Sequence, residues 1–198
     1  MRYFLTTLRH KWFVLLAGLK LGGIPLWRLL IHDWHKFTPA ELPHYNRQFF
    51  GDKGDPEGFA MAWLNHQNHG KHHWEYWCTR SDHSKGGSGA VNGYLPMPET
   101  YVREMVADWM GAARTYGDSL NIQPWLNKNY HKMRLHSCTV DRLEMVLAEI
   151  GVTLPYTEPK LTLADIVEQL RSCQYTCEAG SLENNIMFQV LEEMVGCK

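Results

Sequence analysis

The feature that most constrains the fold is a set of apolar side chains at helical spacing in the first 21 residues. These residues are Leu5, Leu8, Trp12, Leu15, Leu16 and Leu19. Their recurrence every three or four positions predicts a helix from Tyr3 to about Leu21, and Gly22-Gly23 predicts its end. No useful stretch of the chain alternates apolar and polar residues as a strand does. We therefore expect an all-α protein.

Proline and capping residues predict where the next helices begin. Pro25 suits the first turn of a helix that runs to His32-Asp33. Thr38-Pro39-Ala40-Glu41 is typical of a capping box that opens a third helix, with Pro43 able to shift its start. Asp55 is expected to begin a fourth helix, and Gly70 can interrupt this helix. Further helices are expected at 98–116, from 124, at 139–150, at 162–177 and at 181–195, with a loop, interpreted as a lid, over 80–98.

The length of 198 residues fits one compact domain. We predict a single helical domain over 1–198, with a core that carries the functional site at about 8–117 and a C-terminal helical extension at about 121–198. Apolar stripes in the last two predicted helices are interpreted as core or as the surface of a homodimer.

Charge and cysteine content limit the partners and the compartment. The 20 lysines and arginines nearly balance 21 acidic residues, so there is no basic surplus to bind duplex nucleic acid. The first 31 residues contain no apolar run of about 18 residues, the length that a membrane helix needs. The five cysteines are odd in number, which favours a reducing compartment. We expect a soluble, cytoplasmic protein without membrane contact, a membrane-surface helix being the alternative.

Histidines are concentrated in one part of the chain. Eight of the 11 fall between His32 and His83. The sharpest motif among them is His32-Asp33-Trp34-His35-Lys36, in which an imidazole and a carboxylate follow an apolar helix. Divalent transition metals accept this mixture of nitrogen and oxygen ligands. A salt bridge at the helix end is the structural alternative.

Two further residues fit the same site. His10 shares a helix face with Phe13, Val14 and Ala17, so it is expected to point inward. Asp108 lies on the apolar stripe of the helix at 98–116, and a buried carboxylate needs a partner, for which a metal ion is suitable. Glu104, one turn earlier, is interpreted either as an acceptor that orients a histidine ligand or as a solvated residue.

A second histidine cluster surrounds Gly70. In one continuous helix His66, His69 and His73 would share a face, whereas a break at Gly70 would let His72 and His73 turn inward. A polar helix end with exposed histidines is the plain alternative.

In chain order the pattern is H, HDxxK, H, HHxE and D, spread over at least four helices. Here the sequence resembles the HD-domain metal-dependent phosphohydrolase superfamily, and most of all an HD-like family of phage and bacterial genomes whose activity is not characterised. The similarity covers roughly Leu8 to Trp109. It implies an HD-domain-like helical bundle, a small phosphorylated metabolite or nucleotide as substrate, and one or two divalent ions of Fe, Mn, Co, Ni or Zn. The resemblance assigns as metal ligands His10, His32, Asp33, His66, His72, His73 and Asp108, with Asp33 as the bridge between two ions.

The expected reaction is hydrolysis of a phosphate ester by a metal-activated water. Lys36 would neutralise charge on the transferred phosphoryl group, Asp33 would hold the metal, and Glu75 would assist proton transfer or position a ligand. Arg28, Lys71 and Arg80 are weaker candidates for phosphate contacts, and a nucleotide base could stack on Trp34, Trp74 or Trp77. The short gap between His66 and His72, with no GYP motif after His73, disfavours cyclic dinucleotides.

Two other functions fit the same residues. HD-fold dinuclear iron oxygenases take their ligands from equivalent H, HD, H, H and D positions, so the ligand list does not separate them from hydrolases. The third possibility is a noncatalytic, metal-stabilised accessory protein that acts through its C-terminal helices.

Overall fold

The computed structural model describes residues 2–79, 93–117 and 119–155, all within one compact unit, residues 1–155. In this part of the chain every regular element is helical, apart from an isolated bridge between Cys78 and Tyr94, which confirms the all-α prediction. The α-helices are α1 (Arg2–Leu21), α2 (Leu26–Ile31), α3 (Leu42–Phe50), α4 (Pro56–His69), α5 (Glu99–Gly117), α6 (Gln123–Asn129) and α7 (Ser137–Ala148). Short 3₁₀ turns are η1 (Trp34–Phe37), η2 (Trp74–Trp77) and η4 (Tyr130–Lys132).

The helices predicted at 162–177 and 181–195 lie outside the described residues, as does most of the predicted loop at 80–98. The division of 1–198 into a site-bearing core and a C-terminal extension stays a prediction.

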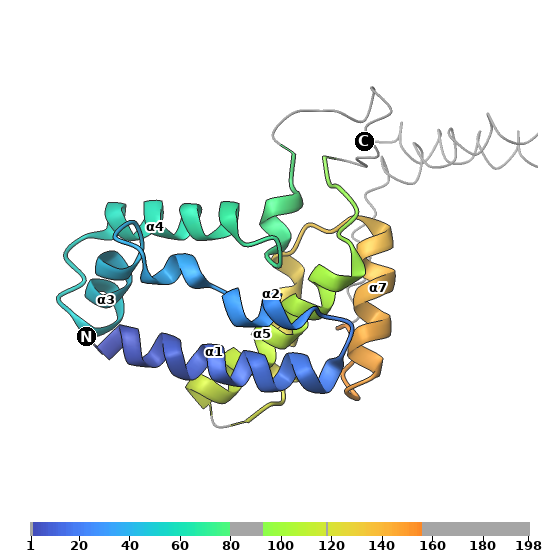
Figure 1. Cartoon of the computed structure of the whole chain (residues 1–198). Coiled ribbons are helices and arrows are strands. Elements are labelled where there is room, and N and C mark those ends of the chain that lie inside the picture. The colour runs from blue at the N-terminus through green and yellow to red at the C-terminus, as the bar shows by residue number, and fades with distance from the viewer. Residues whose placement is uncertain (1, 80–92, 118, 156–198) are drawn as a thin grey trace, which may run out of the picture. The chain divides into compact units, whose positions relative to one another are not determined.

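The core forms where α1 packs along α5 and α7 also packs against α5 (Figure 1). α1 contributes Val14 and Ala17, and α5 contributes Val106 and Met110, all fully or almost fully buried. Burying such side chains stabilises a fold by about 1.5–3 kcal/mol each for the larger ones. This pairing is the frame on which the functional residues of α1 and α5 are held.

A glycine sets the distance between α1 and α5. A Cβ atom at Gly111 would come within 2.5 Å of Val14 Cγ2 and 2.8 Å of the Val14 backbone nitrogen. His10 precedes Val14 by one helical turn, and Asp108 precedes Gly111 by about one turn. The close approach of the two backbones therefore also brings His10 and Asp108 together.

The third helix begins later than the capping box predicts. It starts at Leu42, and Thr38 to Glu41 form turns in which the Thr38 hydroxyl donates a hydrogen bond to the His35 carbonyl at 2.7 Å. Pro43 explains the shift, because a proline fits the first turn of a helix but not its interior. A start at Pro39 would have placed Pro43 in the interior. The other predicted helices of this part of the chain are present, with starts or ends displaced by one or two residues.

Of the two geometries open at Gly70, the structure has the break. α4 ends at His69, and Gly70 adopts an extended conformation as its C-cap. The chain then turns through His72 and His73 into η2, so that both imidazoles point back toward the bundle, where they are in contact with each other and with His32 or His66.

The apolar stripe of α1 faces away from the core. Five of its six large side chains are exposed and Leu15 is half-buried, whereas the opposite face of the helix is buried. The exposed members are Leu5, Leu8, Trp12, Leu16 and Leu19. The buried face instead carries small and polar residues, among them Thr7 and His10, which confirms that His10 points inward. Among the described residues, no helix is both long and apolar enough to cross a membrane.

Replacing Gly111 with alanine tests the α1–α5 contact. We expect Gly111→Ala to lower the free energy of unfolding by about 1–3 kcal/mol, since overpacking outweighs the better helix propensity of alanine. Urea denaturation of the full chain measures it. Gly117→Ala is the matched control, because nothing lies within 4 Å of a Cβ at this position in the same helix. Equal stability of the two variants would contradict the proposed close contact.

Candidate metal centre

Four buried or nearly buried side chains from three segments meet between α1 and α5. His10 comes from α1, His32 and Asp33 from the turn after α2, and Asp108 from α5. His10 Nε2 lies 2.9 Å from Asp108 Oδ1 and 3.7 Å from Asp33 Oδ2. His32 Nε2 lies 3.4 Å from each of the same two oxygens. These four are the residues that the H, HD and D motifs single out.

The distances match those between neighbouring ligands of one metal ion. Nitrogen and oxygen atoms bound at about 2.1 Å stand roughly 3.0–3.5 Å apart in octahedral or tetrahedral coordination. The observed separations of 2.9, 3.4, 3.4 and 3.7 Å bracket that range. The four side chains could therefore hold one ion with little movement.

An unusual backbone conformation at Asp33 directs the motif into the core. Asp33 has φ 53° and ψ 25°, in the left-handed region that L-residues other than Asn and Asp rarely adopt. His32 before it is extended, and η1 begins directly after it. This turn lets two consecutive side chains both point inward, where His32 and Asp33 are 2% and 3% exposed. Such strain is typical of functional positions.

Glu104 lies beside the Nδ1 atoms of two of the histidines. Its Oε1 atom lies 3.2 Å from His32 Nδ1 and 3.5 Å from His72 Nδ1. Its Oε2 atom accepts hydrogen bonds from Arg28 Nε and Nη2 at 2.8 and 2.6 Å. An acceptor at Nδ1 leaves Nε2 of each imidazole as the atom that can bind a metal. Of the two interpretations of Glu104, the structure supports the orienting acceptor. Arg28 is occupied by this ion pair and by the Tyr101 ring, 4.3 Å away.

The two oxygens of Asp33 face different sets of side chains. Oδ2 faces His10 and His32, and also Lys36 Nζ at 2.5 Å. Oδ1 lies 3.4 Å from His72 Nε2 and 3.9 Å from His66 Nε2. A carboxylate placed in this way can bridge two ions.

The histidines on the Oδ1 side form two overlapping groups. Asp33 lies in one triad with His72 and His73 and in another with His35 and His66. The two triads meet where His73 Nε2 and His66 Nε2 are 2.8 Å apart. The ligand set expected from the resemblance is thus assembled around Asp33, but His66, His72 and His73 do not converge on one point with it.

Unsatisfied polar atoms are concentrated at this site. Buried polar groups in proteins almost always have a hydrogen-bond partner, so each exception needs an explanation. The buried atoms without a hydrogen bond of acceptable geometry include His10 Nε2, His32 Nε2, Asp33 Oδ1 and Oδ2, His35 Nε2 and His72 Nε2. Cations bound on the two sides of Asp33 could give these atoms a partner.

The electrostatics also suit a cation. Burial alone would lower the pKa of His32, but Asp33, Asp108 and Glu104 outweigh it and raise that pKa to about 10. Burial opposes ionisation of Asp33, yet His32 and Lys36 hold its pKa well below the usual range. On the other side burial lowers the pKa of His66, so its imidazole stays neutral, the form that binds metals. The three carboxylates that raise the pKa of His32 form a concentration of negative charge that a divalent ion would neutralise.

Other candidate residues lie apart from these groups. Glu75 Oε1 accepts a hydrogen bond from Gln67 at 2.9 Å, burial raises the pKa of Glu75, and it belongs to none of the described metal groups. Lys71 lies over the Tyr76 ring. Trp34 is 67% exposed. Arg80 lies outside the described residues.

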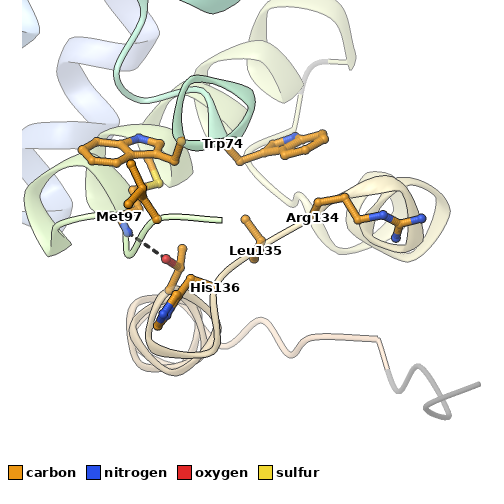
Figure 2. Close-up of a pocket in the computed structure, with 8 residues that line it drawn as sticks. Trp74, Met97, Arg134, Leu135 and His136 are labelled. Atoms are coloured by element: carbon orange, nitrogen blue, oxygen red, sulfur yellow. Dashed lines mark hydrogen bonds between the residues drawn. The ribbon is translucent and has the colours of Figure 1, made fainter. Parts of the chain in front are cut away.

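Trp74 and Trp77 line a small pocket away from the metal groups (Figure 2). Its walls include Met97, whose backbone nitrogen donates a hydrogen bond to the Thr139 hydroxyl at 2.8 Å. Both tryptophans also pack against the hydrophobic core. These contacts are those of core residues rather than of a platform beside the metal ligands.

Two residues of the site were missed in the sequence. His35, an unspecified position of the HDxxK motif, stacks on His66 with ring centroids 4.7 Å apart. Glu41 is fully buried, accepts a hydrogen bond from Asn65 at 2.7 Å and lies 3.4 Å from His66 Nδ1. The sequence signal for the position of Glu41 is Pro43. A proline here moves the helix start past Glu41, so Glu41 does not belong to a capping box.

The fold and the site define an all-α protein with buried histidine and carboxylate groups that could hold a metal ion. Residues 1–149 match the model of a family described as a family of unknown function (DUF5662), and the chain belongs to this family. No curated protein and no solved structure matches the chain. The family match covers every residue of the four-ligand group without assigning an activity to it.

Metal binding should be visible as thermal stabilisation. For the full chain stripped with a chelator, a divalent transition metal at about 100 times its Kd should add about 2.7 kcal/mol and raise Tm by roughly 5–10 °C. His10→Ala should abolish the rise because it removes one ligand. His131→Ala, at an exposed histidine, should retain it. A Tm that no metal raises, or that rises equally in His10→Ala, would contradict the assignment.

Proposed function

We propose that this protein is an HD-like, metal-dependent phosphohydrolase that acts on a nucleotide or a related small phosphate ester. The observation that carries the proposal is the placement of Asp33, whose two oxygens each face a separate set of imidazoles. One or two divalent ions of the Fe, Mn, Co, Ni or Zn type would be held there. The resemblance of the H, HD, H, HH and D pattern to HD-domain enzymes supports the same function.

A metal ion in this site would lower the pKa of a bound water from 15.7 to about 7 and so supply hydroxide at neutral pH. The protein's own groups would hold the ligands and balance charge. Glu104 fixes the His32 ring, and Arg28 fixes Glu104. Because these contacts are made before substrate arrives, the site would need little reorganisation during the reaction.

Lys36 is the cation best placed to act on a phosphoryl group. It is three residues after Asp33, and its ammonium group contacts Asp33 Oδ2 with the side chain only 14% exposed. Burial lowers the pKa of this amine, but Asp33 outweighs burial and raises it, so Lys36 stays charged. A fixed positive charge beside the metal ligands would stabilise charge that develops on the phosphoryl oxygens.

An anaerobic substrate screen tests the proposal. The metal-loaded full chain should release phosphate or a nucleoside from at least one member of a panel of nucleotides and phosphate monoesters. Asp33→Asn should abolish this activity. Lys36→Gln should keep its metal, measured by elemental analysis, and lose roughly 10²–10³-fold in kcat, as when other groups that stabilise transition-state charge are removed.

The control is Lys132→Gln, an exposed lysine that contacts Asn129 and should leave the rate unchanged. Metal at full occupancy with no hydrolysis across the panel would contradict the proposal. Oxygen consumption by the iron form would point to the oxygenase instead, and a biological effect that survives Asp33→Asn without metal would point to the noncatalytic accessory protein.

A further inference from the structure

The outer face of α1 is unusual for a helix on a protein surface. At 100° per residue, the five most exposed apolar side chains of α1 span an arc of only about 80°, directly opposite the buried face. They are Leu5 (64% exposed), Leu8 (44%), Trp12 (56%), Leu16 (45%) and Leu19 (57%). Single exposed apolar residues are normal, but a continuous row of this kind marks a surface that contacts something else.

The neighbouring helix carries further exposed apolar residues. α2 packs beside α1, where a Cβ at Gly18 would touch the buried Leu29 and where Lys11 donates a hydrogen bond to the Leu30 carbonyl at 3.3 Å. The other large residues of α2 are exposed, as is the tryptophan that opens η1. These residues are Leu26 (54%), Trp27 (58%), Leu30 (56%), Ile31 (55%) and Trp34 (67%). We call these five residues, together with the five most exposed apolar residues of α1, the outer apolar face.

The charged residues within the segment that carries most of this face are all basic. Residues 1–31 contain five basic residues, Arg2, Arg9, Lys11, Lys20 and Arg28, and no acidic residue, although the chain as a whole has a net charge of -1. Three of them are exposed on one flank of the α1 stripe, about 40–60° around the helix axis from Leu5. These are Arg2, Arg9 and Lys20.

We propose that the outer apolar face binds the surface of an anionic lipid bilayer, with α1 lying in the plane of the interface. Leucine and tryptophan on one side of a helix, with arginine and lysine along its flank, are the composition of helices that insert a few ångströms into the headgroup region. Anionic headgroups would complement the basic flank. Three tryptophans on the face add side chains that favour the boundary between lipid and water.

A second copy of the chain is a less suitable occupant. A symmetric dimer in which the two α1 helices run antiparallel across this face would place the same basic flanks against each other, and like charges across an interface oppose binding. The lack of an apolar run long enough to span a bilayer predicts no membrane contact, with a membrane-surface helix as the alternative. A helix that lies on the surface needs no such run, and the exposure of the α1 stripe is what the sequence did not reveal.

Vesicle binding of the full chain tests the proposal. The protein should co-sediment with vesicles of phosphatidylcholine and phosphatidylglycerol more strongly than with phosphatidylcholine alone, and added salt should weaken the binding. Leu8→Gln/Leu16→Gln should bind about tenfold or more weakly, because it removes two apolar contacts. Arg2→Gln/Lys20→Gln should lose the preference for anionic vesicles while keeping the apolar contacts.

The matched control is Met61→Gln/Met145→Gln, at two residues that are 61% and 63% exposed on other helices, and it should bind as the wild type does. All variants change exposed side chains, and unchanged circular dichroism confirms their folding. Absence of binding to anionic vesicles, or equal loss in the control, overturns the proposal. A dimer that Leu8→Gln/Leu16→Gln dissociates, without vesicle binding, overturns it in favour of a second copy of the chain.

Discussion

The structure depends on the burial of one carboxylate. Asp33 is 3% exposed, sits in a left-handed backbone conformation and is surrounded by imidazoles on both of its oxygens. A buried charge costs several kcal/mol unless it is paired. Lys36 pairs with only one of the two carboxylate oxygens of Asp33, Oδ2. The remaining compensation must come from His10, His32, His66 and His72 or from an ion that they hold together. The arrangement of the surrounding helices follows from this requirement.

Each helix supplies one part of that arrangement. The close contact of α1 and α5 at Gly111 fixes the separation of His10 and Asp108. The break at Gly70 brings His72 to the opposite side of Asp33. Glu104, held by Arg28, links the two sides because it faces both His32 and His72. The inner face of α1, which contributes to this core, carries mainly small and polar residues. The large apolar residues of that helix lie on its outer face.

Much of this site could be predicted from local sequence patterns. Helical periodicity placed His10 inward and Asp108 on a buried stripe, and the glycine at position 70 pointed to the break that reorients His72. The patterns that failed depend on tertiary contacts. The leucine stripe of α1 could not show which face α5 would cover, and nothing in HDxxK indicated that His35 stacks on His66. The capping motif at Thr38 predicts Glu41 in the first turn of a helix, but Pro43 excludes a helix start at residue 39, and Glu41 faces His66 instead.

The convergence of these side chains on one ion is tested most directly by a crystal structure of the metal-loaded protein with anomalous scattering measured at the absorption edge of the bound metal. The account predicts an anomalous peak about 2.0–2.3 Å from His10 Nε2, His32 Nε2, an Asp33 oxygen and an Asp108 oxygen. A second peak on the Oδ1 side of Asp33 would establish a bridged pair. A protein that shows no peak among these four side chains at saturating metal, or only peaks elsewhere, would contradict the account.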